Sequence, residues 1–382
     1  MNNRTDQGLL PAGLKDILPP EADHEAKTSE ALLTAISRYG YERVKPPLVE
    51  FEDGLLSGQG SALSEQTFRL MDPISDRMMA IRSDVTPQVS RIATTRLSNA
   101  PRPLRLCYSS DILRVRGNEL RPERQFCQVG FELIGPKSIA GDVEIILLAS
   151  ECLNSIGVKD LSIDLNVPTL VTAVLAELNL PKKNIEALQN VIDRKDESGV
   201  RNLSGDAAET IIELFSAVGS APAALDRLSN ISLPPTAKDE ADRLIDVARL
   251  ILESSSDFQL TIDPLEHRSF EYHTGISFTL FGKGVRGELG RGGRYTVHFS
   301  DDSESATGCT LYLDSVVRAI PVYDPPNIIF IPAGNKRSIA EELHASGWVT
   351  IIGLDKVSDV VFEARRLKCT HVWIDSSIKL IN

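Results

Sequence analysis

The 382-residue sequence predicts an α+β fold in which a mainly antiparallel β-sheet is flanked by helices. Segments typical of strands fall in two groups, at 104–134 and 258–313. Residues 168–255 between them are almost wholly helical in pattern, which indicates a helical insertion into the sheet domain. After a Pro-rich linker, residues 327–374 alternate β-α-β-α-β, which predicts a small C-terminal α/β domain.

The N-terminal part predicts further elements in order. Apolar side chains at helical spacing predict a helix over 21–39 that ends at Gly40. Pro46 and Pro47 favour an extended edge segment over 42–51, and two apolar runs at 68–71 and 78–81 predict a β-hairpin. Next, Thr86 followed by Pro87 is typical of a capped helix start.

Length and these patterns predict the domain organisation. A chain of 382 residues exceeds one ordinary domain. We expect a core over 1–322 that contains the insertion 168–255, and a short C-terminal domain over 323–382.

Composition excludes several classes of protein. Hydrophobic residues make up 42% and charged residues 25%, which is ordinary for a globular protein. The net charge of -12 argues against nucleic-acid binding through overall charge. The five cysteines are scattered and form no CxxC pair, and the histidines show no metal spacing, so we expect no metal and no cofactor. Without an apolar run of membrane length or a signal-like N-terminus, a cytoplasmic location without membrane contact is expected.

One segment contains several side chains of kinds that bind ligands. Residues 268–278 read R-S-F-E-Y-H-T-G-I-S-F, in which an arginine, a carboxylate, a phenol and an imidazole interrupt a strand pattern. Buried polar groups need partners. The segment is therefore either a strand with one solvated face or one that holds a small polar ligand over the sheet.

Several stretches resemble the catalytic core of a histidyl-tRNA synthetase, a class II aminoacyl-tRNA synthetase. They are Pro11 to Pro19, Pro46 to Glu50, Ile192 to Asp196 and Gly292 to Tyr295. The resemblance covers roughly 11–320 and implies a class II synthetase-like sheet, with Pro47 in a motif at a dimer interface.

The resemblance also implies a histidine-binding pocket. Asp84 and Thr86 match the residues that hold the amino group of histidine, and His273 stands where the family has a second tyrosine. Carboxylates suit an ammonium group and an arginine suits a carboxylate. The complete set of expected histidine-binding residues is Asp84, Thr86, Arg114, Gln128, Glu132, Arg268, Tyr272 and His273.

A structural role is the alternative for each of these residues. Asp84 is also a favourable residue at a helix start, and Gln128 with Glu132 is also compatible with a satisfied core pair. Arg268 can pair with a carboxylate of the sheet, and His273 can simply pack. The basic loop that begins at Arg114 is either solvated or a site for an anion or a partner.

The part that resembles the nucleotide site departs from the family. Arg114 matches the arginine that contacts the α-phosphate, but Arg116 stands in place of a glutamate. In the third motif, Leu313 replaces a glycine and Ser315 replaces the arginine that binds the γ-phosphate. A hydroxyl cannot replace the bidentate guanidinium, so we expect no adenylation and assign no catalytic residue.

A retained histidine pocket beside a degraded nucleotide site resembles the regulatory subunit family of ATP phosphoribosyltransferase. The resemblance implies a non-catalytic subunit required for the first step of histidine biosynthesis and for feedback inhibition by L-histidine. It further implies a homodimer within a hetero-oligomer with the short-form catalytic subunit, and no tRNA partner. The alternatives are a divergent histidyl-tRNA synthetase or other adenylating ligase, and a scaffold whose pocket is vestigial.

Overall fold

The computed structural model describes residues 8–119, 121–177, 182–204, 208–266, 273–299, 302–323 and 326–381. Arg268 and Tyr272 lie outside these ranges. The chain divides into two compact units, Met1–Pro321 and Val322–Asn382.

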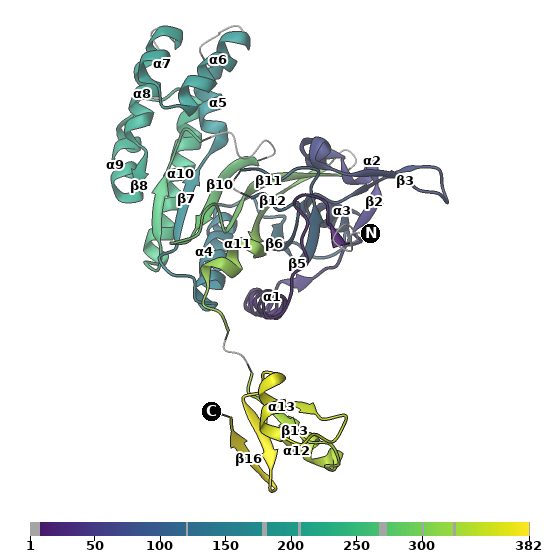
Figure 1. Ribbon diagram of the computed structural model, residues 1–382. Helices are drawn as coiled ribbons and strands as arrows, with labels where there is room; N and C mark the ends of the chain where they lie inside the picture. Colours follow the sequence, from purple (N-terminus) through teal and green to yellow (C-terminus); the bar gives the residue numbers. More distant parts are fainter. Residues whose placement is uncertain are drawn as a thin grey trace. The chain divides into compact units, whose positions relative to one another are not determined.

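The larger unit combines strands and helices (Figure 1). Its strands are β1 (Glu42–Arg43), β2 (Val49–Phe51), β3 (Arg69–Met71), β4 (Met78–Ile81), β5 (Leu104–Leu113), β6 (Gln125–Ile134), β7 (Ser162–Asn166), β8 (Gly219–Ser220), β9 (Gln259–Ile262), β10 (His273–Phe281), β11 (Gly290–Phe299) and β12 (Asp302–Tyr312). Its helices are α1 (Glu21–Ser37), α2 (Glu52–Leu55), the 3-10 helix η2 (Gly58–Gln66), α3 (Thr86–Thr95), α4 (Ala140–Ser155), α5 (Pro168–Ala176), α6 (Lys182–Asp193), α7 (Glu197–Ser204), α8 (Ala208–Ser216), α9 (Ala221–Asn230), α10 (Pro235–Ser254) and α11 (Leu313–Ala319).

A nine-stranded sheet forms the centre of this unit, in the order β1-β5-β6-β12-β11-β10-β7-β9-β8. The strands from β5 to β7 in this order pair antiparallel with their neighbours. The pairs β1–β5 and β7–β9 are parallel. The predicted α+β class with a mainly antiparallel sheet is confirmed.

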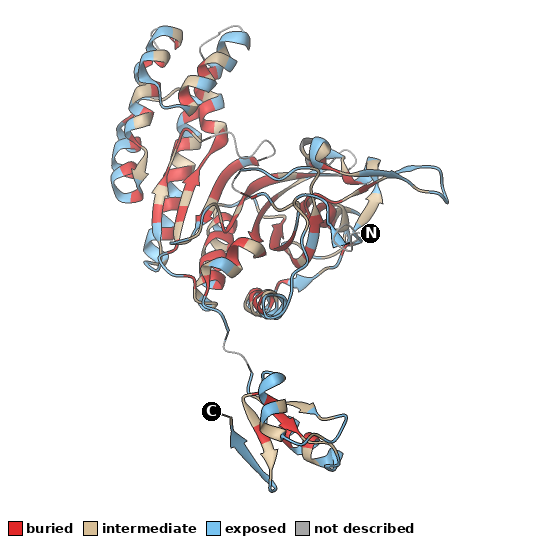
Figure 2. Cartoon of the chain, in the orientation of Figure 1, coloured by how far each residue is buried: buried red, intermediate tan, exposed pale blue. Residues whose placement is uncertain are grey.

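The two faces of the sheet are packed differently. On one face, alternate residues of β6 join an apolar cluster with α1, α4 and α11; they are Cys127, Val129, Phe131 and Leu133. On the other face, Val85, Val89 and Ala93 at and near α3 pack on the sheet. Figure 2 shows the sheet strands as mainly buried. The period of two therefore directs every second residue of β6 toward α3.

The helical insertion extends the first face. Its helices α5 to α10 share one apolar cluster with the sheet, and α10 contacts α4 and α5. In Figure 1, α6 to α9 stand beyond the end of the sheet that carries β7 and β8.

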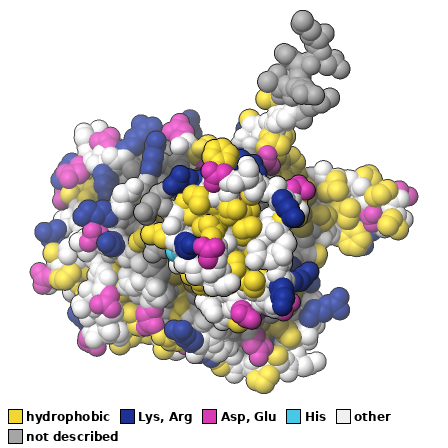
Figure 3. Space-filling view, turned by 60° about the horizontal axis from the view of Figure 1, so that its bottom comes forward, with side chains coloured by type: hydrophobic (Ala, Val, Ile, Leu, Met, Phe, Trp, Pro, Cys, Tyr) yellow, Lys and Arg dark blue, Asp and Glu magenta, His cyan; other side chains and the backbone are white. Residues whose placement is uncertain are grey.

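A second, three-stranded sheet has the order β2-β4-β3, and β3 and β4 form the predicted hairpin. The exposed apolar side chains of this hairpin include Met71 at the end of β3 and Ile74 in the loop, which are 57% and 93% exposed. The hairpin projects at the right of Figure 1, and the projecting arm at the right of Figure 3 is largely hydrophobic.

The smaller unit is a four-stranded sheet in the order β14-β13-β15-β16, and two apolar clusters, each including one helix, pack on it. Its elements are β13 (Ile328–Ile331), α12 (Arg337–Ala345), β14 (Val349–Ile352), α13 (Val360–Arg366), β15 (His371–Ile374) and β16 (Ser377–Leu380). The strands β14, β13 and β15 are parallel, whereas β16 adds an antiparallel edge.

Candidate functional site

Polar residues occupy the middle of the sheet face that α3 covers. On β6, Gln128, Gly130 and Glu132 lie between Phe126 and Ile134, which both belong to the apolar cluster of that face. Gln128 and Glu132 are 0% and 1% exposed. Burial of two polar side chains in an apolar surround requires hydrogen-bond partners.

Hydroxyl groups from three elements supply the partners of Glu132. Tyr295 Oη on β11 donates to Glu132 Oε2 at 2.8 Å. Thr86 Oγ1 on α3 and Tyr108 Oη on β5 donate to Oε1 at 3.2 and 3.4 Å. Tyr108 Oη also lies 3.0 Å from Thr310 Oγ1. These five side chains, here called the hydroxyl network, link four strands and a helix start.

Two glycines create the room for this network. A Cβ at Gly308, which pairs with Glu132 across β12 and β6, would overlap Glu132 Oε2. A Cβ at Gly130 would likewise overlap the Tyr108 ring. Glycine is therefore required at both positions by close approach rather than by a turn.

Asp84 and Gln128 form a second polar pair at the start of α3. Asp84 Oδ1 accepts the backbone N–H of Thr86 at 2.9 Å, and Asp84 Oδ2 accepts Gln128 Nε2 at 2.8 Å. The expectation that Thr86 caps the helix is wrong, because Thr86 is already the first helical residue. The N-cap position is Val85, whose side chain makes no capping hydrogen bond. The hydroxyl of Thr86 is thereby available to Glu132.

Burial governs the protonation of the site. It raises the pKa of Glu132 to about 8, an effect that the hydrogen bond from Tyr295 partly offsets and the negative charge of Asp84 increases. Burial also raises the pKa values of Tyr108 and Tyr295 well above their usual range. The network is therefore largely neutral near pH 7.

The remaining walls come from β10, β11 and β12. His273, Arg291 and Tyr312 line the same cavity as Asp84 and Glu132. Burial, followed by the charge of Arg291, lowers the pKa of His273 to about 3. The cavity measures about 10 Å³, which is room for roughly one water molecule.

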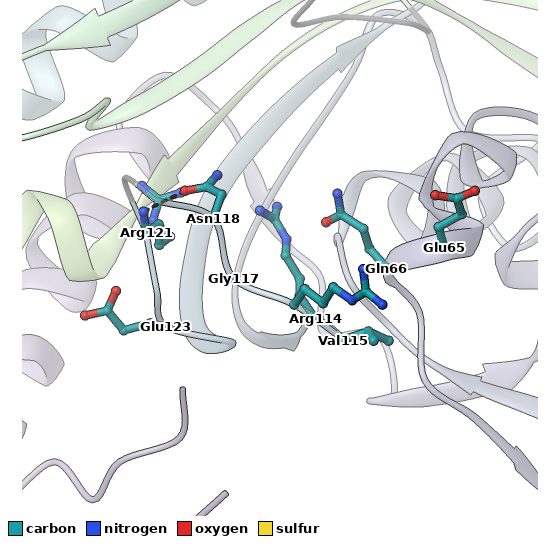
Figure 4. A pocket seen from close by; sticks show the side chains of 9 residues that line it. Glu65, Gln66, Arg114, Val115, Gly117, Asn118, Arg121 and Glu123 are labelled. Atoms are coloured by element: carbon teal, nitrogen blue, oxygen red, sulfur yellow. Dashed lines mark hydrogen bonds between the residues drawn. The ribbon is translucent and has the colours of Figure 1, made fainter. Parts of the chain in front are cut away.

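Four of the predicted residues thus line one cavity, whereas Arg114 lies in another pocket. The four are Asp84, Thr86, Glu132 and His273, and Gln128 is hydrogen-bonded to Asp84 beside them. Arg114 contacts the carbonyl of Ser83 and lines a separate pocket of about 490 Å³ (Figure 4). In Figure 4, Glu65 and Gln66 lie on one side of that pocket, and Asn118 and Arg121 on the other.

Arg121 of this second pocket is held by the start of α11. Its Nε lies 3.2 Å from Asp314 Oδ2 and one terminal nitrogen lies 2.9 Å from Ser315 Oγ. The guanidinium also stacks 3.9 Å from the centre of the Tyr312 ring. Leu313 and Ser315, the two departures from the third motif, are both 1% exposed.

Sequence patterns alone missed the network's other members. Tyr108, Tyr295 and Thr310 lie on the same sheet face as Glu132 because of strand register, which pairs Gly130 with both Tyr108 and Thr310. The sequence offered one signal for these residues. Tyr108 and Thr310 lie within predicted strands, where alternate side chains point to the same face of the sheet.

The described residues provide neither a cluster of metal ligands nor a membrane-spanning helix. In the described ranges, no three His, Cys, Asp or Glu side chains are close enough to hold a metal ion. None of the described helices combines the length and apolar character needed to cross a membrane.

Comparison with known families gives a consistent result. The family model described as histidyl-tRNA synthetase matches residues 13–316. An ATP phosphoribosyltransferase regulatory subunit of Rhodospirillum centenum is 49% identical over 98% of this chain and 96% of its own length. One of Paramagnetospirillum magneticum is 47% identical over 97% of each chain. Both relatives favour the regulatory-subunit interpretation over a divergent synthetase.

Solved structures share the fold. One described as an ATP phosphoribosyltransferase regulatory subunit/histidyl-tRNA synthetase from Bacillus halodurans has a TM-score of 0.82 at 23% identity, covering 94% of this chain and 96% of that one. A histidyl-tRNA synthetase from Nostoc sp. PCC 7120 has a TM-score of 0.80 at 18% identity, covering 96% and 91%. The predicted class II synthetase-like fold is confirmed.

Proposed function

The chain belongs to the family of ATP phosphoribosyltransferase regulatory subunits, and from this premise we propose that it regulates a separate catalytic chain without catalysing a reaction itself. The partner is the short-form ATP phosphoribosyltransferase, and L-histidine is the ligand that inhibits the complex. The observation that carries the proposal is the cavity at which Asp84 and Glu132 meet, since two carboxyl groups without a described ion-pair partner suit the ammonium group of an amino acid.

The second pocket supports the absence of adenylation. The third motif offers a serine hydroxyl, and that hydroxyl is bound to Arg121 of the chain itself. Arg121 is further paired with Asp314, so its charge is balanced internally. Leu313 beside it fills space as a buried apolar side chain. Charge stabilisation of a triphosphate by this motif is therefore not expected.

Feedback inhibition requires that histidine binds two states of the complex with different affinity. A coupling of about 1–3 kcal/mol is typical of such regulation. We place the ammonium group of histidine beside Glu132. Because the cavity there has room for only about one water molecule, its walls must move apart to admit the ligand, and α3 and the sheet would carry that movement.

The test is co-expression with the short-form catalytic chain, followed by co-purification and assay with and without histidine. We expect a complex whose activity depends on this chain and falls when histidine is added. Glu132→Ala should abolish the inhibition but preserve the complex, whereas Asp164→Asn, at a carboxyl outside the cavity, should preserve both. Histidine-dependent pyrophosphate exchange by the isolated chain would contradict the non-catalytic role.

A further inference from the structure

The cavity contains a carboxyl group that can exist with or without its proton in the same surroundings. Glu132 Oε2 accepts the hydrogen bond from Tyr295, while Oε1 faces the hydroxyls of Thr86 and Tyr108. A hydroxyl can donate or accept, so a proton on Oε1 would point at Thr86 or Tyr108 after a rotation of that O–H bond. No heavy atom needs to move.

The network also provides a hydrogen-bond acceptor for the hydroxyl that rotates. Tyr108 Oη lies 3.0 Å from Thr310 Oγ1 and 3.4 Å from Thr86 Oγ1. When Tyr108 Oη accepts a hydrogen bond from the protonated carboxyl of Glu132, its own O–H can turn to donate to Thr310 Oγ1. Both protonation states of Glu132 are therefore satisfied by hydrogen bonds within the described residues, as a buried polar network requires.

The groups around Glu132 differ in charge. Asp84, before α3, is a second carboxylate whose charge disfavours ionisation of Glu132. The phenols of Tyr108 on β5 and Tyr295 on β11 face it as neutral groups, and β12 contributes the hydroxyl of Thr310. His273 on β10 is neutral near pH 7, whereas the guanidinium of Arg291 on β11 lines the same cavity as a positive charge and lies 6.0 Å from the centre of the Tyr312 ring.

We propose that the ammonium group of a ligand, when it enters this cavity, displaces a proton from Glu132, so that binding and proton release are one coupled event. This inference rests on the proposed function, which supplies the ligand as L-histidine. Before binding, the carboxyl is neutral and satisfied by hydroxyls. In the complex, the ammonium group of the ligand stabilises the carboxylate, and the proton leaves to the buffer. The net change is one carboxyl proton lost per ligand bound.

Linkage then fixes the direction of the pH effect. Because the complex binds fewer protons than the free protein, affinity rises with pH below the pKa of Glu132, which burial raises to about 8. The expected increase between pH 6.5 and 7.5 is about tenfold. Feedback inhibition would accordingly strengthen on the alkaline side of neutrality.

Titration calorimetry with L-histidine at pH 7, in buffers of different ionisation enthalpy, tests the coupling. The observed enthalpy should vary with buffer enthalpy at a slope that corresponds to about one proton released. Glu132→Gln should bind more weakly and show a slope near zero. Asp164→Asn removes another carboxyl whose pKa burial raises, but at a site hydrogen-bonded to Thr261, so its proton release should equal that of the unmodified chain.

The outcomes separate the two proposals. Heat that is the same in every buffer would overturn the proton coupling and leave histidine binding intact. An absence of heat in every buffer, for the chain and for its complex with the catalytic subunit, would overturn the proposed function as well. If Glu132→Gln does not fold, infrared difference spectra of the unmodified chain decide: a protonated-carboxyl band must disappear when histidine is added.

Discussion

Glu132 lies out of reach of solvent, and its hydrogen-bond partners in the described part of the chain are the hydroxyls of Thr86, Tyr108 and Tyr295. This arrangement stabilises a neutral carboxyl as well as an ionised one. It also makes the stability of the free protein depend on pH through a single buried group.

The first prediction concerns that dependence. The folded state holds the Glu132 proton up to a pKa of about 8, above its usual 4.5, so the free energy of unfolding falls as pH rises through this window. The fall is at most about 1.4 kcal/mol per pH unit. The Glu132→Gln variant should lack this pH dependence. Urea unfolding of both proteins at several pH values should therefore show that the difference between their free energies of unfolding narrows as the pH falls from 8 to 4.5.

His273 acts in the opposite direction. Its folded pKa of about 3 lies below the usual 6.5, so the unfolded state binds the additional proton and stability rises with pH between these values. The two contributions offset one another between about 4.5 and 6.5, and that of Glu132 stands alone above this range. A difference between the two proteins that is constant with pH would contradict the first prediction.

The second prediction concerns Gly308. Gly308→Ala places a methyl group on Glu132 Oε2 and should destabilise the protein by about 1–3 kcal/mol. Adding Glu132→Ala should recover part of the loss, because the two side chains compete for one space. Gly54→Ala, where a Cβ meets open space, is the matched control and should be near neutral in urea unfolding.

Elements are joined across the sheet by buried ion pairs. Arg294 of β11 binds Asp142 of α4 at 2.9 Å and also donates to the carbonyls of Pro136 and Ser138. Arg121 similarly joins the loop between β5 and β6 to α11 through Asp314 and Ser315. Such pairs favour one arrangement of helices on the sheet, because an unpartnered buried charge is costly.

The third prediction tests the contact of this loop with α11. Arg121→Ala leaves Asp314 without its most buried partner and should cost about 3–5 kcal/mol. Hydrogen exchange should become faster in the loop that follows Arg114. Arg318→Ala is the control, since that side chain reaches the same Asp314 but is 44% exposed, and it should cost less than about 1 kcal/mol. Equal losses for the two variants would refute the role of Arg121.

At the scale of the whole molecule, the projecting hairpin of β3 and β4 presents an apolar surface. Leu70, Met71, Ile74 and Met78 are all exposed there. The hairpin pairs with β2, which directly follows the motif around Pro47 that the resemblance places at a dimer interface. A second copy of the chain is thus the proposed partner of this arm.

The fourth prediction tests this homodimer. Ile74→Asp puts a charge on a side chain that is 93% exposed, so folding of one subunit should change by less than about 0.5 kcal/mol. The dimer should dissociate, because an unpaired charge would be buried between the copies. Sedimentation over a range of concentrations measures this. Leu354→Asp, at a residue 94% exposed in the smaller unit, should leave the dimer unchanged.

The sequence by itself determined the elements and their class. Periods of 2 and 3.6 separate strands from helices locally, so the sheet, the helical insertion and the C-terminal β-α-β-α-β order followed from near neighbours along the chain. The resemblance added Asp84, Thr86, Gln128, Glu132 and His273, which the fold brings together.

Only the tertiary structure decided the partners of Glu132 and the place of Arg114. Strand register sets Tyr108, Gly308 and Thr310 against β6, and register depends on contacts between segments far apart in sequence. The pKa of Glu132 likewise follows from burial by the whole fold, which no local pattern encodes.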